Sequence, residues 1–351
     1  MATRRSDIII PEIFTPYLLE ATTQRDAFLQ SGVVAPMAEL NATEDGGDFV
    51  NVPFFNANLL GDMEPLEDDK SLVPGKITAN KQRGVVLHRG RAFESRDLAA
   101  LAAGADPMAA IGDKLAAYIN HHKQKDLLAC LEGAFGGLTD AKSEGGEDAA
   151  LSELAIGVNE DTATAMTPTS VLKAQSKLGE VGEKLSTIVM HSAIYYSLKE
   201  RRLIDNVLTA QGTVDETNVS TTGTIRPAFE GQSTIPTFCG LRVIVSDDVT
   251  NKDGKYASYL FSPGAVGSGE QMALRTETDR DILAKSNAMS FDAHYVYHPI
   301  GLDFTAAYEK TKGGEGRNPS KTVLAESRNW RLAYELENIG IARITSTSSL
   351  T

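Results

Sequence analysis

The chain has 351 residues, 42% of them hydrophobic and 23% charged, which is length enough for more than one domain and sizeable cores. Its net charge of −13 argues against a tight nonspecific binder of duplex DNA, because such binders use lysine and arginine to displace counterions. No run reaches the ~18 apolar residues of a membrane span, and residues 1–10 lack the apolar region of a signal peptide. The two cysteines, Cys130 and Cys239, make no disulfide framework, which fits a reducing cytoplasm.

Residues 1–45 hold prolines among short apolar pieces, and only Tyr17–Leu29 has the spacing of a short helix. By itself this segment carries too little apolar surface to fold. It is either a mobile terminus or an arm that packs on another surface, and the sequence leaves both possibilities open.

Two strands are expected next, at Phe49–Phe55 and at Lys76–Phe93. Between them Ala57–Gly75 contains prolines, glycines and a cluster of acids, so the two strands form a hairpin with a long tip. An isolated hairpin is marginal in water. We therefore expect a surface outside this subunit to support it.

A long one-faced helix is predicted for residues 106–135. Asp106 can cap its first turn, and the fixed φ of Pro107 suits the first helical position. Its apolar stripe consists of Met108, Ile111, Leu115, Ile119, Leu127, Leu131 and Phe135. The helix should end at Gly136-Gly137, after about 28 residues and a length of roughly 42 Å.

The remaining elements mix helices and strands without regular alternation, which indicates an α+β fold. The helices expected are Pro168–Leu185 with Thr167 as cap, Ser192–Arg201 and Val323–Glu337. The strands expected are Thr187–Met190, Leu241–Ser246, Tyr256–Phe261 and the extended run Ser290–Phe304.

None of the candidate metal-binding, nucleotide-binding or catalytic motifs in the sequence makes a complete site. His294 and His298 are four residues apart, but their surroundings favour a strand, where that spacing is roughly 13 Å and one ion cannot bridge it. Gly264, Gly267 and Gly269 follow a strand in the order G-x-x-G-x-G, which is not a nucleotide-binding pattern. We predict no catalytic, cofactor-binding or metal residues, and no cofactor.

Short motifs in a fixed order resemble the major capsid proteins of tailed bacteriophages, which have the Hong Kong 97-like capsid fold. They are Ile10-Pro11-Glu12-Ile13-Phe14, Asn51-Val52-Pro53-Phe54, Pro74-Gly75-Lys76-Ile77-Thr78, Asp106-Pro107-Met108-Ala109-Ala110-Ile111-Gly112, Met190-His191-Ser192-Ala193-Ile194-Tyr195, Val243-Ile244-Val245-Ser246-Asp247-Asp248, His298-Pro299-Ile300-Gly301 and Asn329-Trp330. Each motif is weak alone, and their order over nearly the whole chain carries the resemblance.

The resemblance implies a structural protein whose hexamers and pentamers tile an icosahedral shell around double-stranded DNA. The implied ranges are an N-terminal arm (1–45), an extended loop (46–95), a peripheral domain with the spine helix (96–166), an axial domain (167–275), return strands of the peripheral domain (276–320) and a C-terminal segment (321–351). Another virion structural protein, such as a tail tube, and a hydrolase with a scattered site are the alternatives.

The resemblance also implies partners. Some relatives begin with a helical scaffolding segment, whereas this chain starts at Met1 almost in the arm, so we expect a separate scaffolding protein. A portal, a possible decoration protein and weakly contacted DNA are the other expected partners, with no membrane. Some relatives cross-link loop lysines, but nothing marks Lys70, Lys76 or Lys81 as reactive.

Charge in the loop suggests how neighbours meet. The loop tip, Gly61–Lys70, has five acids and one lysine, and so a net charge of −4. Residues 76–91 have five cations and no acid. We therefore expect Glu67, Asp68 and Asp69 of one subunit to lie over Arg89 and Arg91 of its neighbour, because opposite charges select the correct surface.

Overall fold

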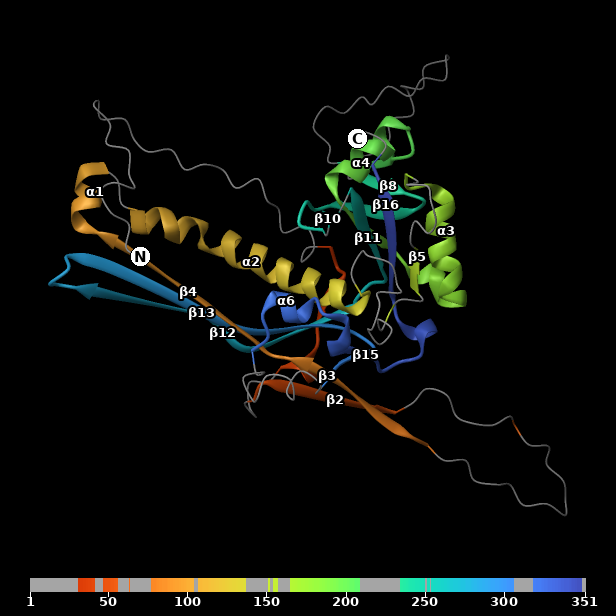
Figure 1. Ribbon diagram of the computed structural model, residues 1–351, viewed down its shortest axis with the longest axis horizontal. Helices are drawn as coiled ribbons and strands as arrows, with labels where there is room; N and C mark the ends of the chain where they lie inside the picture. Colours follow the sequence, from red (N-terminus) through yellow and green to blue (C-terminus); the bar gives the residue numbers. More distant parts are fainter. Residues whose placement is uncertain are drawn as a thin grey trace, which may run out of the picture. The chain divides into compact units, whose positions relative to one another are not determined.

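The computed structural model describes residues 31–41, 47–55, 63, 77–103, 107–136, 151, 154–156, 165–208, 234–249, 251–252, 254–305 and 318–348 (Figure 1). The chain divides into two compact units. Unit 1 comprises Met1–Ser152 and Gly264–Ile339, and unit 2 comprises Glu153–Pro263 and Gly340–Thr351. Each unit combines helices with a sheet, which confirms the α+β class. Among the described residues, none of the helices has both the length and the apolar character to cross a membrane.

Unit 1 is built on a four-stranded sheet in the order β1-β12-β13-β4. Its strands are Val34–Pro36 (β1), Val266–Asp281 (β12), Ser286–Pro299 (β13) and Leu87–Arg96 (β4). The pair β12–β13 is antiparallel from Val266↔Pro299 to Asp281↔Ser286, and β13 pairs antiparallel with β4. The short helix α1 (Asp97–Ala103) follows β4 directly.

The long helix α2 spans Pro107–Ala134 and confirms the predicted spine (Figure 1). Gly136 has φ +75°, a left-handed conformation that glycine adopts without steric cost, and it ends the helix where the sequence predicts. The apolar stripe faces the sheet, since Leu115 and Ile119 share a core cluster with Phe291 of β13. Asp106, the predicted cap, lies outside the described residues.

The hairpin strands are β2 (Phe49–Phe55) and β3 (Ala79–Val85), which pair antiparallel from Phe49↔Val85 to Phe55↔Ala79. The return strand, however, does not run on through Phe93. Val86 interrupts it, and the chain continues as β4 in the main sheet of unit 1. Burial explains the break, because Val86 and Leu87 are fully buried and draw the chain into the core.

Residues 37–41 lie directly on the start of β12. Leu40 is buried in a cluster with Val52, Val86 and Val296, so this segment, the hairpin and the sheet share one core. Gly267 and Gly269 allow the approach, since a Cβ on Gly269 would collide with the backbone oxygen of Leu40. The glycines are therefore sites of close backbone packing, and part of the predicted arm is an integral strand.

Unit 2 contains a sheet in the order β5-β16-β11-β6-β9-β8-β7, with β10 paired to β11. Its strands are Ala155–Ile156 (β5), Thr187–Met190 (β6), Asp205–Leu208 (β7), Thr234–Phe238 (β8), Leu241–Val245 (β9), Asn251–Lys252 (β10), Lys255–Phe261 (β11) and Ile341–Thr347 (β16). Helices α3 (Pro168–Lys177) and α4 (Ser192–Glu200) complete the unit. Strands β6, β9 and β11 confirm the predicted strands to within one residue.

Two predicted helices are shorter than expected. The helix from Pro168 ends at Lys177, and Gly179 with φ +58° leads into a 3₁₀ turn through Lys184. The predicted helix Val323–Glu337 is wrong. Only α6 (Lys321–Leu324) is α-helical there, followed by short 3₁₀ turns at Ser327–Asn329 and Leu336–Asn338. Trp330–Leu332 forms β15 against β14 (Leu302–Phe304).

The side chains of Asn329 and Trp330 explain the early end of α6. Asn329 Nδ2 donates to the carbonyl oxygen of Val323 (2.8 Å), and Trp330 Nε1 donates to that of Leu324 (2.8 Å). These side-chain donors satisfy carbonyls that a continuing helix would have bonded itself.

The observed units shift two predicted ranges. Strand β12 begins at Val266 and belongs to unit 1, so the range 167–275 extends too far. Residues 321–351 divide, with α6 and β15 in unit 1 and β16 in unit 2. Sequence patterns do not show this, because β16 returns to its sheet after a long excursion of the chain.

Candidate assembly surface

Arg89 on β4 is held inside its own subunit. Its Nε donates to Oδ2 of Asp126 at 3.1 Å, and Asp126 is a fully buried residue of α2. Its Nη1 and Nη2 donate to Asn318 Oδ1 (2.7 Å) and to the Pro319 carbonyl oxygen (2.8 Å). The guanidinium therefore joins the sheet, the spine helix and the segment before α6.

Asp126 has further partners that make its burial tolerable. The hydroxyl of Tyr295 donates to Oδ2 at 2.6 Å, and Lys321 Nζ lies 3.8 Å from Oδ1. A buried carboxylate needs such compensation, because burial alone strongly disfavours the charge. Burial, followed by the nearby Asp126 charge, raises the pKa of the Tyr295 hydroxyl well above its usual value, so this hydroxyl stays protonated and keeps its proton to donate.

Arg91, two residues further along β4, is exposed and lies at the edge of a groove. Its Nη1 donates to Tyr118 Oη at 3.2 Å, and its guanidinium carbon lies 5.5 Å from the ring centre of Phe93. Stacking of a cation on aromatic rings fixes the side chain without using its charge on a carboxylate. Arg91 therefore keeps its charge available to a neighbour.

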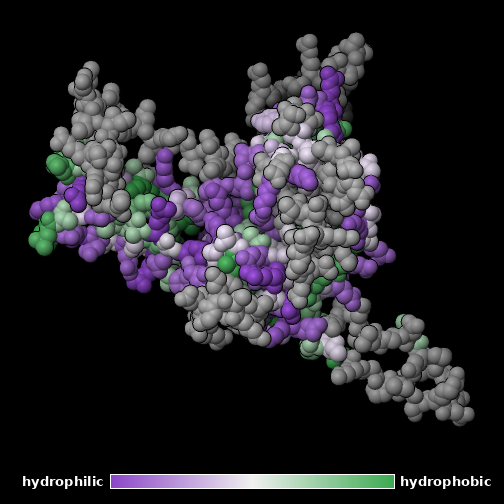
Figure 2. All heavy atoms as spheres, in the orientation of Figure 1, coloured by the Kyte–Doolittle hydropathy of each residue, from purple (hydrophilic) through white to green (hydrophobic). Residues whose placement is uncertain are grey.

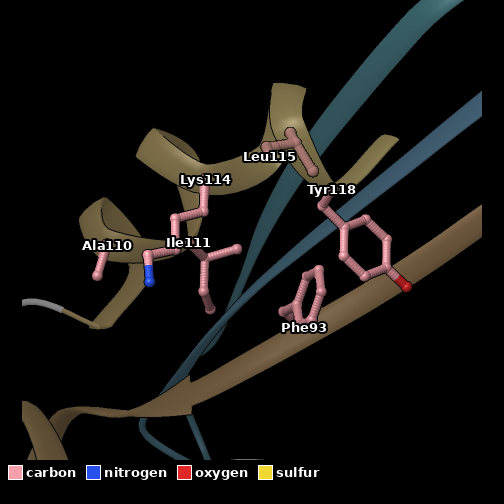
Figure 3. A pocket seen from close by; sticks show the side chains of 6 residues that line it. All are labelled: Phe93, Ala110, Ile111, Lys114, Leu115 and Tyr118. Atoms are coloured by element: carbon pink, nitrogen blue, oxygen red, sulfur yellow. The ribbon is translucent and has the colours of Figure 1, made fainter. Parts of the chain in front are cut away.

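The groove lies between the first half of α2 and β4 and encloses about 270 Å³. Figure 3 shows Phe93 on the strand facing the helical side chains, with Lys114 at the same site. The lining residues are Phe93, Ala110, Ile111, Lys114, Leu115 and Tyr118. An apolar floor with cations at its edge suits a segment that carries both apolar and acidic side chains.

A smaller cavity of about 110 Å³ adjoins the groove at Tyr118 and includes Arg91, His122 and Lys321. Burial, with the neighbouring Lys321 charge as the next contribution, lowers the pKa of His122. A neutral imidazole therefore lies between cations at this end of the groove.

The predicted contact residues differ in whether their charges are already used inside the subunit. Arg89 is committed to Asp126, which leaves Arg91 as the predicted cation that faces outward. Glu67, Asp68 and Asp69 lie outside the described residues. The sequence interpretation missed Asp126, although an acid directly before Leu127 and Leu128 was a signal that the buried stripe contains an ion pair.

His294 and His298 contact different groups. His294 and His298 both lie on β13, as predicted. The rings of His294 and His88 pack at a tilt with their centres 4.2 Å apart, while His298 Nε2 donates to the Leu302 carbonyl oxygen at 2.8 Å. Within the part of the chain that the structure describes, no three His, Cys, Asp or Glu side chains are grouped to hold a metal.

Comparison with known proteins decides the family. Residues 31–337 match the family described as Major capsid protein 13-like. The major capsid protein of Bacillus phage SPP1 is 35% identical over 352 residues, which cover 97% of this chain and 97% of that protein. The chain belongs to this major capsid protein family.

Solved structures agree on the fold. The capsid of Ralstonia phage GP4 aligns over 97% of this chain and 96% of that chain with a TM-score of 0.61 and 10% identity. The capsid of cyanophage Pam1 aligns over 96% and 97% with a TM-score of 0.55 and 11% identity. The Hong Kong 97-like capsid fold predicted from the sequence is thereby confirmed.

Family membership defines the role of the chain. It is a structural, non-enzymatic component of the virion that assembles with itself into the head shell of a tailed phage. The alternatives of a tail-tube protein and a hydrolase fall away, because the family match spans both units.

Proposed function

We propose that the chain forms hexamers and pentamers that close an icosahedral shell around double-stranded DNA, each subunit being supported by the loop of its neighbour. The hairpin carries the proposal. Phe55 at the end of β2 is 76% exposed, and Met63 and Ile77 are also largely exposed. Apolar side chains on a thin hairpin cost free energy in water unless another surface covers them.

The groove of a neighbouring subunit is the surface that we assign to the loop tip. The tip combines Met63 and Leu66 with the acids Glu67, Asp68 and Asp69. The groove combines an apolar floor with Lys114 and Arg91. Arg89 is no longer proposed as a partner, because its charge already compensates Asp126.

The domain ranges fit the same proposal. Unit 1 corresponds to the arm, extended loop and peripheral domain of the fold, and unit 2 to the axial domain at the capsomer centre. Assembly would take place in the cytoplasm of the bacterial host. A separate scaffolding protein, a portal and possibly a decoration protein would take part, and DNA would be contacted weakly, as the net charge of −13 favours.

Electron microscopy of the purified chain, alone and with a scaffolding partner, tests assembly itself. We expect capsomers or closed shells. A strictly monomeric chain at high concentration, with the scaffold present, would contradict the proposal.

Charge reversal tests the contact of the loop tip. Glu67→Lys, Asp68→Lys and Asp69→Lys together should leave a folded subunit that assembles poorly, because each tip then meets cations of its own sign. Adding Arg91→Glu and Lys114→Glu should restore part of the yield. Adding Arg89→Glu instead should unfold the subunit, because it places a second carboxylate beside Asp126. Normal yield and salt resistance of the triple variant would refute the electrostatic role of the tip.

A further inference from the structure

The smaller cavity of unit 1, which encloses about 110 Å³, is lined by a buried carboxylate and by several cations. It lies between the middle of α2, strands β4 and β13, and the start of α6. Along α2 the surface changes from mainly hydrophobic near the start of the helix to mainly hydrophilic towards its middle (Figure 2). We call this space the Asp126 cavity, and its polar lining includes Arg89, Arg91, Tyr118, His122, Asp126 and Lys321.

The two carboxylate oxygens of Asp126 differ in how they are bonded. Oδ2 accepts hydrogen bonds from Arg89 Nε (3.1 Å) and from the Tyr295 hydroxyl (2.6 Å). Oδ1 is buried as well, and no group among the described residues hydrogen-bonds to it. Leaving a buried acceptor unpaired is unfavourable, since the oxygen has lost its contact with water. A molecule in the cavity that donates a hydrogen bond to Oδ1 would remove this cost.

The spacing of the polar groups leaves room for such a donor. Lys321 Nζ lies 3.8 Å from Asp126 Oδ1, which is longer than a hydrogen bond. One oxygen atom can lie about 2.8 Å from both atoms at once. It would accept a hydrogen bond from Lys321 and, if it carries a proton, donate one to Asp126. A water molecule or the hydroxyl of a larger ligand meets this condition.

Charge and size favour an anion over water alone. The charged lining residues are three cations and one carboxylate, a net charge of +2, namely Arg89, Arg91, Lys321 and Asp126. Burial, and next the charge of Lys321, lowers the pKa of His122, so the imidazole adds no further charge at neutral pH. Fixed positive charge at a partly enclosed site attracts anions. The volume of about 110 Å³ also exceeds the roughly 30 Å³ that one water occupies.

We propose that the Asp126 cavity binds a phosphate group that carries a proton. Its P–OH group would donate to Asp126 Oδ1, and its charged oxygens would accept from Lys321 and Arg91. Inorganic phosphate keeps a proton at neutral pH, whereas a phosphate monoester loses its last one near roughly pH 6. The phosphodiesters of DNA have no proton to donate. The site should therefore select free phosphate over DNA, and also over sulfate, which presents only acceptors to the carboxylate.

Calorimetric titration of the unassembled full-length subunit tests the ligand, at matched ionic strength. At pH 8 we expect one phosphate ion bound per subunit, and sulfate bound roughly tenfold more weakly or worse, because it offers Asp126 no hydrogen bond. Absence of phosphate binding overturns the proposal. Equal affinities for phosphate and sulfate also overturn it, because they would report attraction to the cations alone.

Adenosine 5′-monophosphate separates the two sources of a phosphate group. At pH 8 it should bind roughly tenfold more weakly than inorganic phosphate, since it has lost its proton. Binding at pH 5.5 would show that a protonated monoester also fits, and its absence there would identify the free ion as the ligand. Parity with inorganic phosphate at pH 8 would overturn the role assigned to the proton.

Two lysine variants locate the site. Lys321→Gln should weaken phosphate binding by roughly tenfold, because a charge-assisted hydrogen bond is lost. Lys114→Gln is the matched control, since Lys114 lines the neighbouring groove and not the Asp126 cavity, and it should bind phosphate like the parent. Equal affinities of the two variants would overturn the assignment to this cavity. Melting of each variant, measured without phosphate, shows that the subunit is folded.

Asp126→Asn tests the carboxylate directly. Its carboxamide can donate a hydrogen bond, so the preference for phosphate over sulfate should be lost. A folded Asp126→Asn subunit that keeps the full preference would overturn the role of Asp126. If this variant does not fold, the comparison of sulfate with phosphate on the parent chain and the lysine pair decide the question. None of these measurements depends on assembly, so they are independent of the proposed function.

Discussion

The two ends of α2 differ in how completely they are buried against the rest of unit 1. From residue 127 to 135 the helix end buries Leu127, Leu128, Cys130, Leu131, Ala134 and Phe135, and Asp126 just before them anchors Arg89, Tyr295 and Lys321. At the other end, Ala110, Ile111 and Lys114 line an open groove, and among the described side chains of residues 107–120 only Leu115 and Ile119 are buried. We call the first the core end and the second the groove end.

The difference shows how one helix can serve two purposes. The core end holds the subunit together, with close packing and compensated charge. The groove end leaves apolar surface that the described residues of the subunit do not fill, which is costly unless a neighbour fills it. Variants at the core end should therefore change the melting of the isolated subunit, and variants at the groove end should change assembly.

Asp126→Ala should have the largest effect on the subunit. It leaves the Nε of Arg89 and the buried Tyr295 hydroxyl without their acceptor, and breaking such a network costs about 3–5 kcal/mol. Urea unfolding of the unassembled subunit measures the loss. Adding Arg89→Ala should recover part of it, because the partly buried guanidinium charge is then removed together with its partner. Unfolding within about 0.5 kcal/mol of the parent would show that the network contributes little.

The sequence predicts a structural feature here only where the residues that determine it are close together in the chain. Pro107, the apolar spacing and Gly136 are local, so the limits of α2 follow from the sequence. The strands Phe49–Phe55 and Thr187–Met190 were found for the same reason. The pairing of Arg89 with Asp126 and the end of α6 at Leu324 depend on contacts between distant residues, and no local pattern contains them.

Acid should weaken unit 1 through His298. Burial lowers the pKa of this imidazole to about 4, against about 6.5 in an unfolded chain. Between those values the unfolded state binds a proton that the folded state does not, so stability falls as pH drops from 6.5 to 4, by about 3 kcal/mol. The pH dependence of unfolding should be flatter in His298→Asn over this window, and identical slopes would contradict the burial of a neutral imidazole.

Gly133→Ala should have a smaller effect at the core end. A Cβ there would lie 2.6 Å from Trp330 Nε1 and would collide with the carbonyl oxygen of Leu324, so the α6–β15 segment must shift. Overpacking of this kind costs about 1–3 kcal/mol. Gly112→Ala is the matched control, because nothing lies near its Cβ position, and alanine should be neutral or stabilising there. Equal melting temperatures of the two variants would show that α6 is not packed tightly on α2.

Ile111→Ala should have the smallest effect on the subunit and separates the two ends of α2 most directly. Ile111 lines the groove and is only partly buried, so its truncation should lower the stability of the isolated subunit by less than about 1 kcal/mol. The reference is Leu131→Ala at the fully buried core end, where the same kind of truncation costs about 2–5 kcal/mol. For assembly we expect the opposite order when shell yields are compared for equal amounts of folded subunit. Ile111→Ala should then lower the yield more than Leu131→Ala, because a neighbour's loop tip in the groove would lose contact with Ile111 in every subunit of the shell. Shell yield and heat-induced disassembly, measured beside subunit melting, give both quantities for each variant. If Ile111→Ala destabilises the subunit as much as Leu131→Ala and leaves shells of the folded fraction unchanged, the groove end is ordinary core and needs no neighbour.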